Sequence, residues 1–119
     1  MKTKVLQQIL LDASLDTEGT VLLKKTLCAI EDILVDTRKC IPDERYLAVG
    51  HHMAEVIKRA QRGEVLAKID QETEDQIESA YKEKSKNILT SLKSLGNTTS
   101  SSSEIILLAI HLQCASNGF

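Results

Sequence analysis

The sequence predicts an all-α fold, a compact bundle of four or five helices. Apolar residues recur with a helical period along almost the whole chain, and no segment shows the alternation of a half-buried strand. Proline occurs once, as Pro42, and it falls between two periodic segments. The length of 119 residues suits a single domain, and an aromatic content of only 3% means that its core must be aliphatic.

The first part of the chain predicts two helices. Residues 1–17 are expected to form a short amino-terminal helical segment, and residues 18–119 a helical domain. Gly19 is expected to break the chain between them, and the next helix to run to about Cys40. The apolar face of that helix consists of Leu23, Leu27, Ile30 and Leu34.

The remaining helices follow from their start and stop signals. Pro42, followed by two acidic residues, starts a helix that Gly63 is expected to end. A long helix is predicted over residues 71–95, with acidic residues near its start and lysines later. The serine-rich stretch 98–103 is interpreted as a loop, and the last helix is apolar on nearly every side over residues 105–112, as in the centre of a bundle.

Charge and apolar patterning exclude several classes of protein. The 15 basic and 17 acidic residues are in mixed order, so there is no basic stripe for direct binding of nucleic acid. The longest apolar run, residues 105–110, is too short to cross a bilayer, and the amino-terminal segment lacks the continuous apolar stretch of a signal peptide. Three cysteines without CxxC spacing are typical of reduced thiols, so we expect a cytoplasmic protein.

Two histidines on apolar helical faces are the main candidates for function. His52 is followed seven residues later by Arg59, and His111 is preceded by Glu104 at the same spacing. Seven residues are close to two helical turns, roughly 10 Å of rise, so each charged residue lies on nearly the same stripe as its histidine. A histidine in such a place serves either packing or chemistry.

Each of these residues also has a purely structural interpretation. His52 can pack its ring at the edge of the core and bond to a carbonyl group. Arg59 can extend along the helix surface into water. Ser101 and Glu104 have the spacing of a capping box, in which each side chain satisfies an amide of the first helical turn.

Metal binding and enzymatic activity receive little support from the sequence. His51, His52, His111 and Cys114 are metal-ligand types, but only His111 and Cys114 share one helical face, at a spacing of three. There is no glycine-rich phosphate loop and no HExxH motif. No metal, cofactor or catalytic residue is therefore predicted, and a helical interaction or metal-binding module with structural histidines is the alternative function.

Two stretches of the chain resemble the PTS regulation domain of bacterial antiterminators and transcriptional activators. PDERYLAVGHHMAEVIKR, residues 42–59, is similar to the first histidine motif of that family, with His52 and Arg59 at the matching positions. EIILLAIHL, residues 104–112, is similar to its closing motif, with Glu104 and His111 matching. One position departs from the pattern, because His51 stands where the family usually has aspartate.

The resemblance implies a regulatory domain that is phosphorylated on His52 and His111 by the phosphoenolpyruvate-dependent sugar phosphotransferase system. Arg59, Glu104 and His51 are the supporting residues, and His51 is also a competing acceptor. The partners implied are a histidine phosphocarrier or a sugar-permease component, together with a second copy of the chain in a homodimer. The 119 residues leave no room for a nucleic-acid-binding module, so we expect a stand-alone domain that acts through a partner or through dimer packing in transcriptional or carbohydrate regulation.

Overall fold

The chain is all helical in the part that the computed structural model describes, residues 1–35, 41–96 and 101–117. This result confirms the predicted all-α class. Six α-helices are present in these ranges, whereas four or five were predicted, because one predicted helix is interrupted. In chain order the elements are α1 (Thr3–Ala13), α2 (Thr17–Val35), α3 (Asp43–Arg62), α4 (Gln71–Asp75), α5 (Ser79–Thr90), the short 3-10 helix η1 (Lys93–Leu95) and α6 (Ser102–Asn117).

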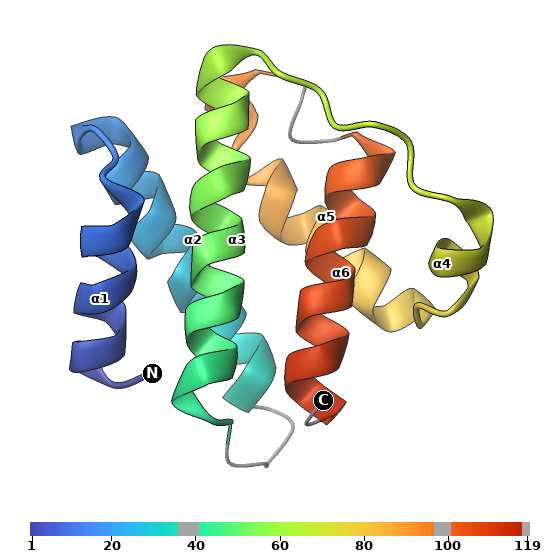
Figure 1. Ribbon diagram of the computed structural model, residues 1–119, viewed down its shortest axis with the longest axis horizontal. Coiled ribbons are helices and arrows are strands. Elements are labelled where there is room, and N and C mark those ends of the chain that lie inside the picture. The colour runs from blue at the N-terminus through green and yellow to red at the C-terminus, as the bar shows by residue number, and fades with distance from the viewer. Residues whose placement is uncertain (36–40, 97–100, 118–119) are drawn as a thin grey trace.

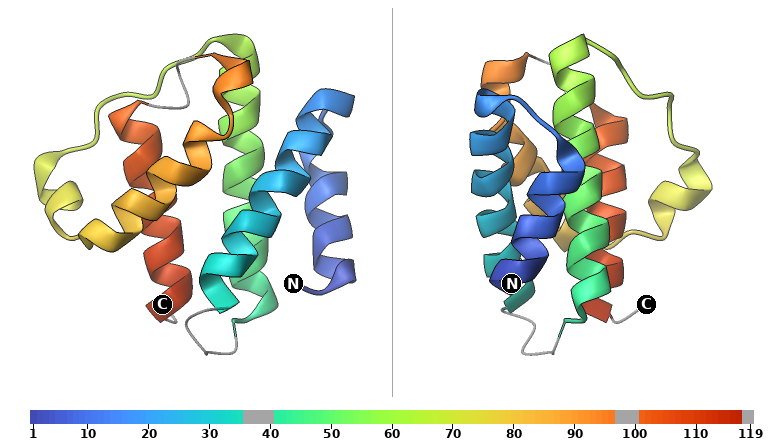
Figure 2. Two further views of the ribbon diagram at one scale, coloured as in Figure 1. Left: turned by 180° about the vertical axis from the view of Figure 1, so that it is seen from behind. Right: turned by 60° about the vertical axis from the view of Figure 1, so that its left-hand side comes forward.

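Helix α3 is the centre of the arrangement. It packs against α1, α2 and α6, while α5 packs on α6 and α2 (Figure 1). Seen from behind, α2 and α5 form a second layer across α3 and α6 (Figure 2). The main core lies between these layers and is aliphatic, as its fully buried residues Leu23, Ile30, Leu34, Met53, Ile57, Leu89, Leu92, Leu108 and Leu112 show.

The amino-terminal segment forms a helix, as predicted, and α1 packs closely on α3. Ile9 of α1 is completely buried and lies against the backbone of α3 at Gly50. A Cβ atom on Gly50 would overlap the Ile9 side chain. The two helices therefore approach each other where α3 has no side chain.

The start of α2 differs from the prediction. The Asp16 carboxylate accepts a hydrogen bond of 2.7 Å from the Gly19 N–H, and this bond lowers the pKa of Asp16. It also satisfies an amide of the first helical turn, so Gly19 lies inside α2 and does not break the chain. The predicted extension to Cys40 lies outside the described residues, and within them α2 ends at Val35.

Both predicted boundaries of α3 are confirmed. Pro42 precedes the first residue of the helix, and Gly63 follows the last. Gly63 has a φ of 70° and donates its N–H to the Ala60 carbonyl oxygen at 3.1 Å. This left-handed conformation is favourable for glycine and ends the helix.

The predicted long helix over residues 71–95 is wrong, because the chain turns between Asp75 and Ser79. Gln113 of α6 supports the turn. Its amide oxygen accepts the Glu78 N–H at 2.8 Å, and its amide nitrogen donates to the Gln76 carbonyl oxygen at 3.2 Å. These bonds replace helical ones, and Ile77 in the turn becomes buried.

Helix α6 is apolar on nearly every side because it lies between two clusters. Leu108 and Leu112 belong to the main core. Ile106 and Ala109 form a second cluster with Ile77 from the turn before α5. Among the described residues, no helix is long and apolar enough to span a membrane.

Candidate functional site

The two candidate histidines lie against each other between α3 and α6. His52 of α3 stacks on His111 of α6, with ring centroids 4.4 Å apart and ring planes inclined by 26°. The two helices run in opposite directions at this contact, as Figure 1 shows. Sequence reasoning found both residues, and the structure brings them together as a pair.

Arg59 and Glu104, the charged residues seven positions from the two histidines, form a second contact between the same helices. Arg59 donates two hydrogen bonds to the Glu104 carboxylate, from Nε to Oε2 at 3.1 Å and from Nη2 to Oε1 at 2.8 Å. The sequence interpretation placed each charged residue on the stripe of its own histidine. The structure instead pairs the charged residues with each other, two turns along from the rings.

A signal for this pairing is present in the sequence. The order is histidine then arginine in one helix, but glutamate then histidine in the other, with the same spacing of seven. Antiparallel packing that aligns His52 with His111 therefore also aligns Arg59 with Glu104. Sequence reasoning missed this consequence because it considered each helix separately.

The ion pair is largely shielded from water. The Glu104 side chain is 3% exposed and the Arg59 side chain 16%. The two parallel N–H donors of arginine match the two oxygens of a carboxylate, which fixes the geometry of the pair. One of the two hydrogen bonds of the predicted capping box is present, because Ser101 Oγ accepts the Glu104 N–H at 3.3 Å. The Glu104 side chain binds Arg59.

Both rings are held in the neutral form near pH 7. Burial lowers the pKa of His52 to about 3, with further lowering by the charge that His111 carries when it is protonated and by the positive charge of Arg59. Burial also lowers the pKa of His111. A neutral imidazole keeps a lone pair on one ring nitrogen, so either residue has the electronic form of a nucleophile.

The surroundings of the two rings are not the same. Nε2 of His52 is buried and has no hydrogen-bond partner among the described residues. His111 has no ring nitrogen that is both buried and without a hydrogen-bond partner among the described residues. His111 is also the less buried of the two rings.

The structure places His51 away from the pair. Its Nε2 lies 2.9 Å from Oδ2 of Asp12 in α1, and its side chain is 47% exposed. Consecutive residues of a helix project about 100° apart, which explains why His51 and His52 have different neighbours. Asp12 was not among the sequence candidates because its role depends on how α1 packs against α3.

Of the residues considered for metal binding, only His52 and His111 lie together. His51 faces Asp12, and Cys114 is a partly exposed free thiol at a cavity of about 270 Å³ that Gln113 and Ile110 also line. Within the described ranges, no three His, Cys, Asp or Glu residues are grouped so as to hold a metal ion.

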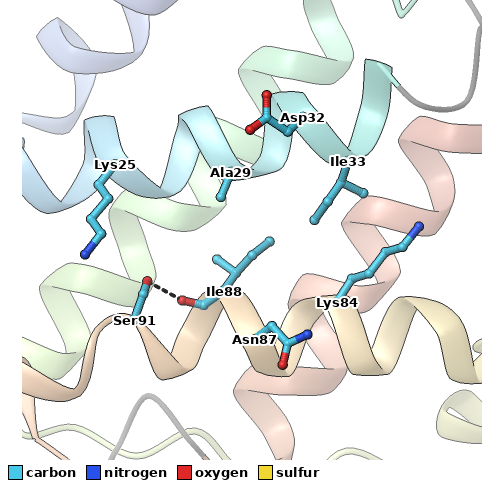
Figure 3. Close-up of a pocket in the computed structure, with 8 residues that line it drawn as sticks. All are labelled: Lys25, Ala29, Asp32, Ile33, Lys84, Asn87, Ile88 and Ser91. Carbon is cyan, nitrogen blue, oxygen red and sulfur yellow. Dashed lines mark hydrogen bonds between the residues drawn. The ribbon is translucent and has the colours of Figure 1, made fainter.

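A separate cavity of about 360 Å³ lies between α2 and α5 (Figure 3). Lys25 of α2 and Lys84 of α5 lie at different ends of it, and the Ser91 hydroxyl is bonded to the Ile88 carbonyl oxygen. None of the candidate residues lines this cavity.

Comparison of the chain with protein-family models, with curated proteins and with solved structures finds no match. We therefore infer the function from the geometry of the histidine pair and the Arg59–Glu104 ion pair.

Proposed function

We propose that this chain is a regulatory domain, similar to the PTS regulation domain, that is phosphorylated on histidine by the phosphoenolpyruvate-dependent sugar phosphotransferase system. The observation that carries the proposal is the stacked pair of His52 and His111, two neutral imidazoles between helices that also share the Arg59–Glu104 ion pair. A neutral imidazole attacks phosphorus through its lone pair, so the pair supplies acceptors.

The physical consequence of phosphorylation supports a regulatory role. A phosphoryl group adds about −1.5 to −2 charges and three acceptor oxygens at the contact between α3 and α6. Arg59 is a cation of α3 whose charge already acts on His52. The phosphoryl group therefore competes with Glu104 for the Arg59 guanidinium.

If the phosphoryl group binds the Arg59 guanidinium, Glu104 remains as a buried carboxylate without its cation. A buried charge separated from its partner is strongly unfavourable, so the first turn of α6 should loosen from α3. That turn also bonds to the segment before α4, because Ser103 Oγ donates to the Ala67 carbonyl oxygen at 2.8 Å. In this proposal, phosphorylation at the rings changes a surface two helical turns away.

The remaining parts of the proposal are its setting and partners. The phosphoryl donor is a histidine phosphocarrier or a sugar-permease component, and the place of action is the bacterial cytoplasm. The output is a change in how two copies of the domain pack, or in how the domain binds a partner, in transcriptional or carbohydrate regulation. The domain accepts a phosphoryl group and does not turn over a substrate, so it is not an enzyme.

A second candidate function is a helical interaction module in which the histidines only pack. The feature that favours it is the burial of both rings, with Nε2 of His52 unpartnered within the described residues. In that case replacement of either ring by phenylalanine should preserve the fold and all functions.

The test is incubation of the full chain with the general phosphocarrier, its kinase and phosphoenolpyruvate, followed by intact mass measurement at alkaline pH. We expect the mass of a phosphoryl group on the wild-type chain and none on the double variant H52F/H111F. H51Q is the matched control, since it removes the exposed histidine next to His52 and should be labelled like the wild type. An unlabelled wild-type chain beside a labelled control domain would refute the proposal, and a labelled double variant would move the site to His51.

A further inference from the structure

We infer that His111 is the phosphoryl acceptor of the pair and that His52 is a positioning residue whose ring supports one face of His111. This inference deepens the proposed function and rests on it for its biological meaning. It assigns different roles to two residues that the sequence motifs treat alike.

The ring nitrogens of the two histidines differ in their access to water. Nε2 of His52 is buried without a partner among the described residues, so a phosphoryl group on that atom would place a dianion in a region closed to water. Burial of an unpaired charge is far more costly than burial of a neutral ring. His111 carries no such buried, unpartnered nitrogen and is the less buried ring.

The geometry of the stack determines which parts of the two rings cover each other. Rings with centroids 4.4 Å apart and planes within 26° cover each other through their faces. The lone pair of an imidazole nitrogen lies in the ring plane and points outward from its edge. His52 therefore restrains the orientation of His111 and shields one face of its ring, while the stack itself covers neither nitrogen lone pair of His111.

The transfer can be written for a donor that carries its phosphoryl group on nitrogen. The lone pair of a ring nitrogen of His111 forms the new N–P bond as the P–N bond of the donor breaks. The electron pair of that bond leaves with the donor nitrogen, which is an imidazole in a phosphocarrier and ammonia in phosphoramidate. The other ring nitrogen of His111 loses its proton. The departing imidazole of a phosphocarrier takes up that proton, whereas phosphoramidate is already protonated on nitrogen and expels neutral ammonia, so the proton then passes to water. Phosphohistidine remains on the chain.

Phosphoramidate tests the acceptor without any phosphocarrier. In an H51Q chain, labelled sites are mapped by peptide mass spectrometry, and the wild-type chain shows the rate at the exposed His51. We expect label on His111, and at least about tenfold slower labelling of His52, because a dianion at its buried nitrogen is strongly disfavoured. Labelling of His52 at an equal or higher rate overturns the inference. So does a wild-type chain in which His51 is labelled and His111 is not.

The positioning role is tested by the titration of the His111 ring, followed by NMR. H52F keeps an aromatic ring on His111, whereas H52Q removes the ring; His52→Leu replaces H52Q if that variant does not fold. Both variants leave the Arg59–Glu104 ion pair between the two packed helices in place. We expect the lowered pKa of His111 to persist in H52F and to return towards its ordinary value in H52Q, because burial is what lowers it. An unchanged titration in the ring-free variant overturns the positioning role.

The two proposals fail in different ways. If phosphoramidate labels His111 but the phosphocarrier does not, the proposed function is refuted and the assignment of the acceptor stands. If the phosphocarrier labels His52 and leaves His111 unlabelled, the function stands and this inference is refuted.

Discussion

The strongest stability prediction concerns the Arg59–Glu104 ion pair. We consider the variant R59M, which removes the guanidinium and keeps most of the aliphatic stem. Glu104 then remains as a carboxylate with only 3% of its side chain exposed, and its two hydrogen bonds from Arg59 are lost. Removing one partner of a buried ion pair costs about 3–5 kcal/mol of unfolding free energy. We expect the lower end, about 3 kcal/mol, because the Arg59 side chain is partly exposed.

The opposite variant should cost less. In E104L the guanidinium loses its partner, but Arg59 reaches water more readily than a buried carboxylate does. We therefore expect a loss of about 1–2 kcal/mol. The double variant R59M/E104L removes both charges, and its loss should be smaller than the sum of the two single losses by about 2 kcal/mol.

The assay is urea unfolding followed by circular dichroism, combined as a double-mutant cycle. For a domain of this length, a loss of about 3 kcal/mol corresponds to a decrease in Tm of roughly 10 °C. The matched control is K58M, which breaks the Lys58–Glu55 pair on the outside of the same helix, where the charges are 3.6 Å apart. It should change stability by less than about 0.5 kcal/mol. A cost for R59M as small as that of the control, or fully additive single variants, would refute the reasoning.

Three further predictions concern other parts of the molecule. G50A should destabilise the fold by about 1–3 kcal/mol, because its Cβ would overlap Ile9 of α1. The lowered pKa of His52 means that the unfolded chain binds more protons between pH 6.5 and about 3, so stability is present above pH 6.5 and is lost as pH falls through that range. The loss attributable to His52 should be about 1 kcal/mol per pH unit, measured as the difference between wild type and H52F. Q113L should speed hydrogen exchange of the Glu78 amide and cost about 1 kcal/mol, because it removes both bonds to the turn before α5.

Each of these has a specific contradicting result. An unchanged Tm in G50A would mean that α1 does not pack on α3 as described. Identical pH profiles for wild type and H52F would show that His52 protonates equally in the folded and unfolded chain. Unaltered exchange at Glu78 in Q113L would mean that the turn is stable without α6.

The helices were largely predictable because their determinants are local. The apolar period of α2, the signals at Pro42 and Gly63 and the apolar character of residues 105–112 all act within a few residues of chain. The break between α4 and α5 was not predictable in this way. It depends on Gln113, which is 35 residues from the amide that it binds.

The candidate site likewise has features that local sequence determines and features that depend on tertiary packing. His52 and His111 could be found from helical faces alone, and so could the different directions of His51 and His52. The partner of His51 could not, since Asp12 becomes its neighbour only when α1 packs on α3 at Gly50. The buried state of Glu104 likewise depends on tertiary packing, although its capping-box spacing with Ser101 was visible locally.

The equal seven-residue spacing on α3 and α6 couples the His52–His111 stack to the Arg59–Glu104 ion pair. Because seven residues separate ring from charge on both helices, one antiparallel register aligns the histidine stack and the Arg59–Glu104 pair at the same time. A slide of α6 along α3 by one turn, about 5.4 Å, would break both contacts together. A charge introduced at the rings and a change at the ion pair therefore act on the same degree of freedom, the register of α6 on α3. In the proposed function, this shared register is the means by which a phosphorylated histidine would act as a regulatory switch.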